Sequence, residues 1–273
     1  MRDITYPPIV VAAKLGFKAL GLRFQMSGTE HVPRAGGALL AVNHISYVDF
    51  ILGGFAAQPA KRLVRFMAKR ELFDHKYAGP LMRSLHHINV DRADGLASYE
   101  EGLKYLRMGE VVGIFPEATI SRSFEIKELK TGATRMAAEA AVPLIPVILW
   151  GTQRMMTKDH PKDFSRGKTI AISVGEPMHP AGANPVAETA ELRERMGTLL
   201  DRAILDELAD PLLHLLRNSE PDATTFRSRL VLATASYRLY ADAIADRAPE
   251  RPTKRVYSRD PHRPVRLRHR ARR

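Results

Sequence analysis

Residues 38–50 read ALLAVNHISYVDF, and this stretch decides the fold of the chain. Its apolar run, residues 39–42, predicts a short buried strand. The residues from Ser46 onward predict a helix, with Ser46 as its N-cap. His44 therefore lies at a corner where a strand turns into a helix.

The corner matters because of the spacing between His44 and Asp49. On a continuous strand these two residues would point to opposite faces, and on a continuous helix they would be rotated by roughly 140°. A chain that bends between them can bring the Asp49 carboxylate back to the imidazole. One ring nitrogen would then face the acid, and the other could accept a proton from a substrate hydroxyl. This arrangement is a serine-hydrolase triad without its nucleophile, which indicates that the nucleophile belongs to a substrate.

The same spacing separates His86 from Asp91, so the spacing alone is a weak signal. Residues 87–90 predict a single strand, and we expect the two ends of that strand to diverge. For His44 the alternative is a histidine that only packs in the core or caps a helix.

The basic charge of the chain is concentrated at one end. The 273 residues carry a formal net charge of +12, of which residues 251–273 contribute +9. We expect this tail to be disordered and to attract any polyanion, and an anionic membrane surface is as good a partner as nucleic acid, at about 1 kcal/mol for each basic residue near the lipid. Of the two partners we expect the membrane and no nucleic acid. A solvated tail without a partner is the alternative. The chain has no cysteine, which excludes disulfides, thiolate nucleophiles and cysteine-ligated metals.

Residues 8–24 predict an amphipathic helix, with Phe17 and Leu20 on its apolar side and Lys14 and Lys18 on the next. This segment is too short and too charged to span a bilayer, and no other run is long and apolar enough. It can lie in the membrane interface or pack on its own domain. The sequence therefore predicts no transmembrane segment.

Apolar runs alternate with helical patterns along the rest of the chain. This alternation predicts an α/β fold with a mostly parallel sheet of about seven strands flanked by helices. Sites in such sheets gather at the carboxyl ends of the strands, and His44, Asp91 and Glu117 each follow a predicted strand. The strands are predicted at residues 23–27, 39–42, 65–68, 87–90, 111–115, 144–149 and 169–174, and the helices at residues 47–56, 78–85, 95–108, 131–139 and 185–207.

These patterns divide the chain into four segments. Residues 211–248 contain helical patterns but no strand signal, so they predict a C-terminal helical extension. We expect an N-terminal amphipathic helix at residues 1–24, an α/β domain at 25–210, the helical extension at 211–250 and the basic tail at 251–273.

Residues 111–123 read VVGIFPEATISRS and predict a second element of the site. Glu117, Ala118 and Thr119 make a tight turn after a strand, and backbone amides in such a turn can face an anion. Lys130 precedes the next helix, where free amides and positive charge also favour an anion. Taken alone, a segment of this kind is usually only a turn.

Four blocks of residues occur in a fixed order between residues 38 and 150. They are Asn43, His44, Ser46 and Asp49; Ile88, Val90, Asp91 and Arg92; Phe115, Pro116, Glu117, Ala118 and Thr119, with Lys130, Thr131 and Gly132 behind them; and Val142, Pro143, Leu144, Ile145, Pro146 and Val147. Each block alone is unspecific. Their order and spacing together resemble the 1-acylglycerol-3-phosphate acyltransferase family, the glycerolipid acyltransferases.

The resemblance implies an O-acyltransferase of phospholipid biosynthesis. His44 would deprotonate the acceptor hydroxyl, Asp49 would orient His44, and the hydroxyl would attack an acyl thioester directly. The resemblance implies no metal and no cofactor besides the co-substrate, acyl-CoA or acyl carrier protein. It also implies a lysophospholipid acceptor and a peripheral location on the cytoplasmic face of the cell membrane. The residues expected to bind substrate are Asn43, Ser46, Lys69, Arg92, Glu117, Ala118, Thr119, Arg122 and Lys130.

Two positions depart from the family pattern, which is usually Phe-Pro-Glu-Gly-Thr-Arg in the third block. Ala118 stands in place of the glycine and Ile120 in place of the arginine. Alanine does not easily adopt a positive φ, and an apolar side chain cannot bind phosphate as a guanidinium does. Arg122 could supply the missing charge, and Lys69 and Arg70, just past the third predicted strand, are a second possible source. We expect 1-acylglycerol-3-phosphate as the acceptor, with another lysophospholipid or a glycolipid as the alternative.

Two other classes of protein remain open from the sequence. A metal-dependent hydrolase could use His44, Asp49, Glu117 and either His86 or His87, since first-row metals accept such ligands. A non-catalytic protein could bind a membrane or nucleic acid through its basic tail.

Overall fold

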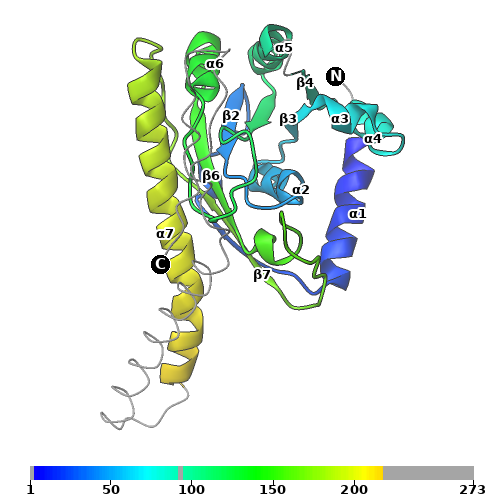
Figure 1. The fold of residues 1–273 in the computed structure, drawn as a ribbon, viewed down its shortest axis with the longest axis vertical. Coiled ribbons are helices and arrows are strands. Elements are labelled where there is room, and N and C mark those ends of the chain that lie inside the picture. Colours follow the sequence, from blue (N-terminus) through cyan, green and yellow to red (C-terminus); the bar gives the residue numbers. More distant parts are fainter. Residues whose placement is uncertain (1–2, 92–94, 218–273) are drawn as a thin grey trace, which may run out of the picture.

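The computed structural model describes residues 3–91 and 95–217, and these form an α/β sandwich around one sheet (Figure 1). The sheet has seven strands in the order β1-β7-β6-β2-β5-β3-β4. All seven predicted strands are confirmed, and each end lies within one residue of its predicted position. The strands are β1 (Arg23–Ser27), β2 (Ala38–Val42), β3 (Val64–Lys69), β4 (Ile88–Val90), β5 (Val111–Ile114), β6 (Leu144–Trp150) and β7 (Thr169–Val174).

The sheet is mostly parallel, as the sequence predicts. β6, β2, β5, β3 and β4 run parallel to one another, whereas β7 runs antiparallel to β6, and β1 pairs in parallel with β7. The carboxyl ends of five strands therefore meet at one edge. His44, Glu117 and Asp91 follow β2, β5 and β4 at that edge.

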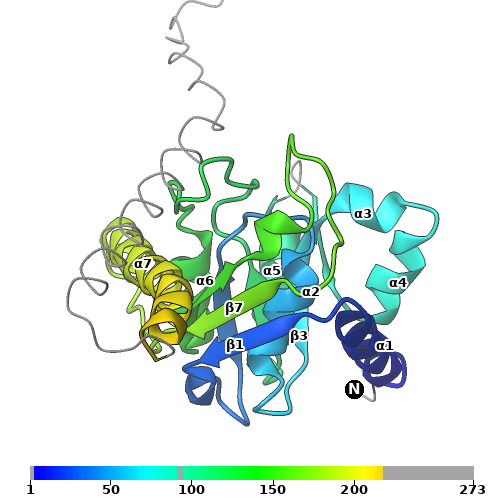
Figure 2. The same cartoon turned by 90° about the horizontal axis from the view of Figure 1, so that it is seen from below.

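Both faces of the sheet are covered by helices, because the central strands are apolar on both sides. Leu39 and Ala41 of β2 pack in one core cluster with the helices α5 (Gly95–Arg107), α6 (Gly132–Ala140) and α7 (Pro185–Arg217). Leu40 and Val42 pack in the other cluster, beside α2 (Asp49–Gly53) and the 3-10 turn Gly54–Ala57. Figure 2 shows α7 and α1 on opposite sides of the sheet, in keeping with the two core clusters that they contact. Since every side chain of β2 is fully buried, this strand fixes where its corner lies.

The N-terminal helix α1 (Tyr6–Ala19) is shorter than predicted. The expected end at residue 24 is wrong, because Gly21 adopts a positive φ of 59° and the chain then enters β1. Phe17 packs against the second core cluster, as predicted for the apolar side. The opposite side leaves Val11 and Leu15 exposed.

The last described helix, α7, is longer than predicted. It starts at Pro185, as expected, but it continues past residue 207 to Arg217, so the expected boundary at residue 210 falls inside a helix. The rest of the expected extension, residues 218–250, and the basic tail lie outside the described residues, as does Arg92. Within residues 3–91 and 95–217, no helix is long and apolar enough to cross a membrane.

The two helices between β3 and β4 are short. α4 (Ala78–Ser84) is confirmed, whereas α3 (Arg70–Asp74) was not predicted from the sequence. Because α3 starts directly after β3, it places Arg70 at the same edge as His44.

Candidate active site

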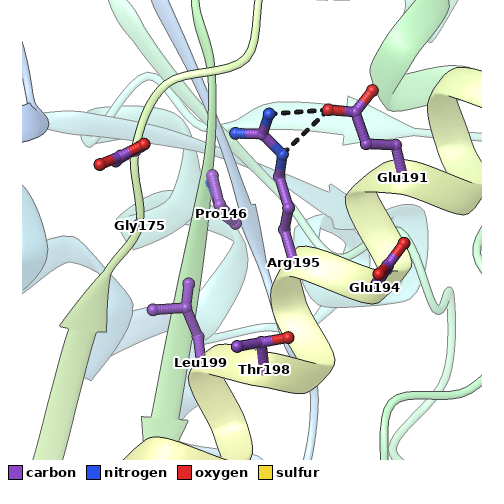
Figure 3. Close-up of a pocket in the computed structure, with 8 residues that line it drawn as sticks. Pro146, Gly175, Glu191, Glu194, Arg195, Thr198 and Leu199 are labelled. Atoms are coloured by element: carbon purple, nitrogen blue, oxygen red, sulfur yellow. Dashed lines mark hydrogen bonds and ion pairs between the residues drawn. The ribbon is translucent and has the colours of Figure 1, made fainter.

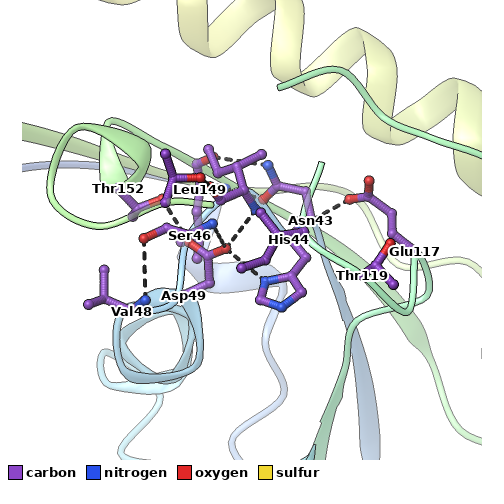
Figure 4. Close-up of polar contacts among 12 residues, drawn as sticks. Asn43, His44, Ser46, Val48, Asp49, Glu117, Thr119, Leu149 and Thr152 are labelled. Atoms are coloured by element: carbon purple, nitrogen blue, oxygen red, sulfur yellow. Dashed lines mark hydrogen bonds and ion pairs between the residues drawn. The ribbon is translucent and has the colours of Figure 1, made fainter. Parts of the chain in front are cut away.

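His44 and Asp49 form a hydrogen-bonded pair at the corner between β2 and α2 (Figure 4). Nδ1 of His44 lies 3.0 Å from Oδ2 of Asp49, so the neutral ring donates its Nδ1 proton to the carboxylate. Asp49 is fully buried, whereas the His44 side chain is 22% exposed. No described residue forms a hydrogen bond with Nε2, so in the neutral ring this nitrogen carries an unpaired acceptor site. The corner thus gives the geometry that the spacing predicts.

Asp49 is held by four hydrogen-bond donors. Besides His44, the amides of Ile45 and Ser46 donate to Oδ2 at 2.7 and 2.6 Å. The hydroxyl of Thr152 donates to Oδ1 at 2.7 Å. These charge-assisted bonds fix the carboxylate, and through it the orientation of the imidazole. Thr152 follows β6 and was not found from the sequence, because nothing in its local sequence connects it with Asp49.

Ser46 does not cap α2, so that expectation is wrong. The N-cap is Val48, whose apolar side chain cannot form a cap bond, and the Ser46 hydroxyl accepts a hydrogen bond from the Val48 amide at 3.3 Å. The Ser46 hydroxyl instead donates to the carbonyl of Met156 at 2.6 Å. Ser46 is fully buried, so in this structure it supports the corner.

Asn43 ties the end of β2 to β6. Its side-chain Nδ2 donates to the carbonyl of Leu149 at 3.0 Å, and its Oδ1 accepts the amide of Leu149 at 2.7 Å. The buried side chain thereby continues the pattern of the sheet by one more pair of bonds. Both hydrogen-bonding groups of Asn43 are used inside the protein, directly next to His44.

Glu117 also supports His44 through the main chain. Its Oε1 accepts the amide of His44 at 2.9 Å, and its Oε2 accepts the amide of Lys127 at 3.3 Å. Burial raises the pKa of Glu117, while the two amides and the Lys127 ammonium oppose that shift. The sequence predicts a contact between Glu117 and the substrate, and in this structure both carboxylate oxygens face the protein.

Ala118 keeps the backbone conformation that a glycine would provide. Its φ is 59°, in the left-handed region, and its amide donates to the carbonyl of Phe115 at 3.0 Å. An alanine in this region costs about 1 kcal/mol relative to an ordinary conformation. The turn after β5 therefore survives the exchange of glycine for alanine.

The positively charged side chains near the turn have different partners. Arg122 forms an ion pair with Asp159 at 2.7 Å. The Asp159 carboxylate therefore offsets part of the positive charge that is expected to replace the missing arginine. The ammonium of Lys127 lies 2.6 Å from the hydroxyl and 2.8 Å from the carbonyl of Thr119. Desolvation and nearby Lys158 lower the pKa of Lys127, against the raising effect of Glu117. Lys127 was not found from the sequence, and it places a positive charge beside Ile120, whose carbonyl lies 3.3 Å away.

Two further predicted lysines are exposed at the same edge. Lys69 is the last residue of β3, and Lys130 lies two residues before the start of α6. Arg70, next to Lys69, pairs with Asp91 at 2.8 Å. Arg92 lies outside the described residues, so its expected role stays a prediction.

The second histidine–aspartate spacing makes no pair. His86 lies 4.0 Å from Asp3, whereas Asp91 contacts Arg70. His87 is buried, accepts the amide of Phe66 at 3.0 Å, and has its pKa lowered to about 4, chiefly by desolvation. In the described parts of the chain, no three histidine, aspartate or glutamate side chains are grouped as metal ligands.

A separate open cleft lies beside α7 (Figure 3). Pro146, Gly175 and Leu199 line it together with Glu191 and Arg195, which form an ion pair at 2.7 Å. None of the predicted site residues lines this cleft.

Replacing Glu117 with glutamine tests whether this side chain supports His44 or binds the acceptor. A glutamine side chain can accept a hydrogen bond from only one of the two backbone amides, so His44 should shift. We therefore expect kcat to fall about tenfold or more, while the KM for the acceptor changes by less than about twofold. Steady-state kinetics at varied acceptor concentration measures both constants. Glu128→Gln, at an exposed position on the same segment, is the matched control. A raised KM with unchanged kcat would instead assign Glu117 to the acceptor.

Comparison with known proteins agrees with this geometry. A family model described as Acyltransferase matches residues 23–150, which include β1 to β6 and the corner at His44. The 1-acyl-sn-glycerol-3-phosphate acyltransferase of Bacillus subtilis is 33% identical over 187 residues, covering 66% of this chain and 88% of the relative. The enzyme of the same name from Pseudomonas aeruginosa is 25% identical and covers 75% of this chain and 77% of the relative.

A solved structure shares the fold. The crystal structure of the 1-acyl-sn-glycerophosphate acyltransferase from Thermotoga maritima superposes with a TM-score of 0.60 at 22% identity, covering 71% of this chain and 78% of that one. The ordered blocks, the dyad at the end of β2 and the identity with the Bacillus relative all lead to one assignment. This chain belongs to the 1-acyl-sn-glycerol-3-phosphate acyltransferase family of O-acyltransferases.

Proposed function

We propose that this protein transfers a fatty acyl group from an acyl thioester to the free hydroxyl of 1-acyl-sn-glycerol-3-phosphate. The observation that carries the proposal is the His44–Asp49 pair, in which no hydroxyl of the described residues is hydrogen-bonded to the ring. A general base without a protein nucleophile fits a reaction whose nucleophile is a substrate hydroxyl. The Bacillus and Pseudomonas relatives, both named 1-acyl-sn-glycerol-3-phosphate acyltransferase, support this choice of acceptor.

The reaction proceeds in one displacement. Nε2 of His44 takes the proton of the acceptor hydroxyl as the oxygen attacks the thioester carbonyl, and Asp49 stabilises the imidazolium that forms. The C–O ester bond forms, the C–S bond breaks, and the imidazolium returns its proton to the leaving thiolate. Backbone amides at the corner or in the turn after β5 stabilise the oxyanion. The acyl donor is acyl-CoA or acyl carrier protein.

Positive side chains at the same edge bind the phosphate of the acceptor. Lys69 and Lys130 are exposed there, and Lys127 keeps a positive charge beside Ile120. Arg92 would add a guanidinium from the second block. Because Arg122 pairs with Asp159, it is a weaker candidate than Lys127. The loss of the arginine at residue 120 also supports testing acceptors without a phosphomonoester.

The protein works at a membrane surface, on its cytoplasmic face. α1 exposes Val11 and Leu15 next to Lys14 and Lys18, a combination that suits the boundary between headgroups and acyl chains. The basic tail would add attraction to anionic lipids. The protein would therefore meet its lipid acceptor in the membrane that holds it.

Thiol release from a long-chain acyl-CoA tests the proposal directly, because a chain without cysteine adds no thiol of its own. We expect release only when 1-acyl-sn-glycerol-3-phosphate is present, faster in anionic vesicles than in neutral ones, with phosphatidic acid as the product by mass spectrometry. A monoacylglycerol of the same chain length has the same hydroxyl without the phosphate and serves as the control. Release without any acceptor would identify a thioesterase. Equal rates with the control acceptor would contradict the role of the phosphate.

A further inference from the structure

The loop that follows β6 holds the catalytic corner in place. Its residues make four hydrogen bonds with residues 45–49. The carbonyl of Met156 accepts the Ser46 hydroxyl and the amide of Tyr47, and the hydroxyl of Thr157 donates to the carbonyl of Ile45 at 2.6 Å. The fourth bond joins Thr152 to Asp49, and it is the one that reaches a catalytic side chain.

Thr152 contacts the carboxylate oxygen that does not face His44. Its hydroxyl lies 2.7 Å from Oδ1 of Asp49, and no other described residue donates to that oxygen. Both residues are fully buried, so water cannot replace the bond. Thr152 is itself fixed, because the Gly151 amide and the Gln153 side chain bond to each other at 2.8 Å, and the Met155 amide donates to the Thr152 carbonyl at 3.0 Å.

We propose that Thr152 is a positioning residue that controls, through Asp49, the pH at which His44 becomes a free base. This inference rests on the proposed role of His44 as the general base. Besides Asp49, Glu117 from the turn after β5 is a charged group close to His44, and its Oε1 accepts the His44 amide at 2.9 Å. A substitution at Thr152 leaves that contact unchanged, so a change in the titration of the ring reports on Asp49. A carboxylate shares one negative charge between two oxygens. A hydroxyl donor at Oδ1 stabilises charge on that oxygen and so draws charge away from Oδ2, which faces the imidazole.

Loss of the hydroxyl therefore has two effects on the pair. More of the carboxylate charge lies on Oδ2, and the imidazolium is held more strongly, so the ring loses its proton only at higher pH. The carboxylate also loses the bond that opposes its rotation, so the ring is less well oriented. Both effects lower the fraction of His44 that is neutral and correctly placed at neutral pH.

Thr152→Val removes the hydroxyl and keeps the shape of the side chain. We expect kcat to fall about 10- to 100-fold, the equivalent of one hydrogen bond to a charged group, with little change in KM. The acidic limb of the pH–rate profile should move to higher pH by about half a unit to one unit. Thr152→Ser retains the hydroxyl and should restore both the rate and the limb. If the valine variant does not fold, Thr152→Ala removes the same hydroxyl and serves in its place.

Thr157→Val is the matched control. It removes an equally short hydrogen bond between the same loop and the same segment, but that bond ends on the carbonyl of Ile45. We expect this variant to lower the Tm as Thr152→Val does and to leave the acidic limb in place.

A second readout does not depend on acyl transfer. The His44 ring is titrated by NMR in the full chain, with its signal assigned by comparison with His44→Gln. We expect its midpoint to move to higher pH in Thr152→Val and to stay in place in Thr152→Ser and Thr157→Val. A Thr152→Val protein with a lower Tm but an unmoved midpoint would overturn the proposal and leave Thr152 a purely structural role. Because the midpoint is measured without substrate, this result is separate from any failure of the proposed function.

Discussion

Replacing His44 with alanine should lower kcat by about 10²- to 10⁴-fold, the usual contribution of a general base. The imidazole is the one group of the corner that is both partly exposed and bonded to a buried carboxylate. Without it, the acceptor hydroxyl must attack while it still carries its proton. The loss should appear in kcat more than in either KM, because the base acts in the transition state. Thiol release with acyl-CoA and saturating acceptor measures it.

His86→Ala is the control for this variant. His86 has the same spacing to an aspartate, but its ring lies near Asp3 and not near Asp91. We expect its kcat to stay within about twofold of the unmodified protein, since surface substitutions away from a site have small effects. A His44→Ala protein that keeps its fold by circular dichroism and most of its kcat would show that another group is the base.

The sheet could be predicted from the sequence because its strands are apolar on both faces. β2 is buried along its whole length, and such a strand reads as a continuous apolar run. The dyad could be predicted because the corner and the spacing of His44 and Asp49 are both local. Here the six residues from His44 to Asp49 contain the geometry, and no distant segment is needed to infer it.

The supporting contacts could not be predicted, because they join segments far apart in the chain. Thr152 is 103 residues from Asp49, and Glu117 is 73 residues from His44. The sequence predicts that Glu117 lies at the carboxyl edge of the sheet, but it does not predict the direction of its side chain. That direction depends on the amides of His44 and Lys127, which come together only when β2 and β5 pair.

The predicted ends of the two outer helices are wrong for two different reasons. α1 ends at Ala19 because Gly21 takes a left-handed conformation, which is a common helix stop and a signal present in the sequence. α7 continues through Pro211, a residue that normally interrupts a helix. Its anchor to the sheet is Glu207, which accepts the indole N–H of Trp150 at 2.7 Å and pairs with Arg154. A pairing between segments this far apart leaves no signal in the local pattern.

Asp49→Asn should remove most of the activity while it preserves most of the fold. The asparagine carbonyl can replace Oδ2 and accept the amides of Ile45 and Ser46, and its NH₂ group then meets the Thr152 hydroxyl, which can turn to accept. The hydrogen bonds are therefore kept and the charge is lost. Asp49→Ala, in contrast, leaves two buried amides without partners, at about 1–3 kcal/mol each.

We expect Asp49→Asn to lower kcat by about 10²- to 10⁴-fold, because the imidazolium formed in the transition state has no carboxylate beside it. Its Tm should fall much less than that of Asp49→Ala. Kinetics and thermal unfolding of both variants measure the two quantities, with Asp201→Asn on the exposed side of α7 as the carboxylate-to-amide control. If Asp49→Asn keeps more than about a tenth of kcat, orientation by hydrogen bonds is what His44 requires and the charge contributes little. If its Tm falls as far as that of the alanine variant, the asparagine has not taken over the hydrogen bonds, and its loss of activity says nothing about charge.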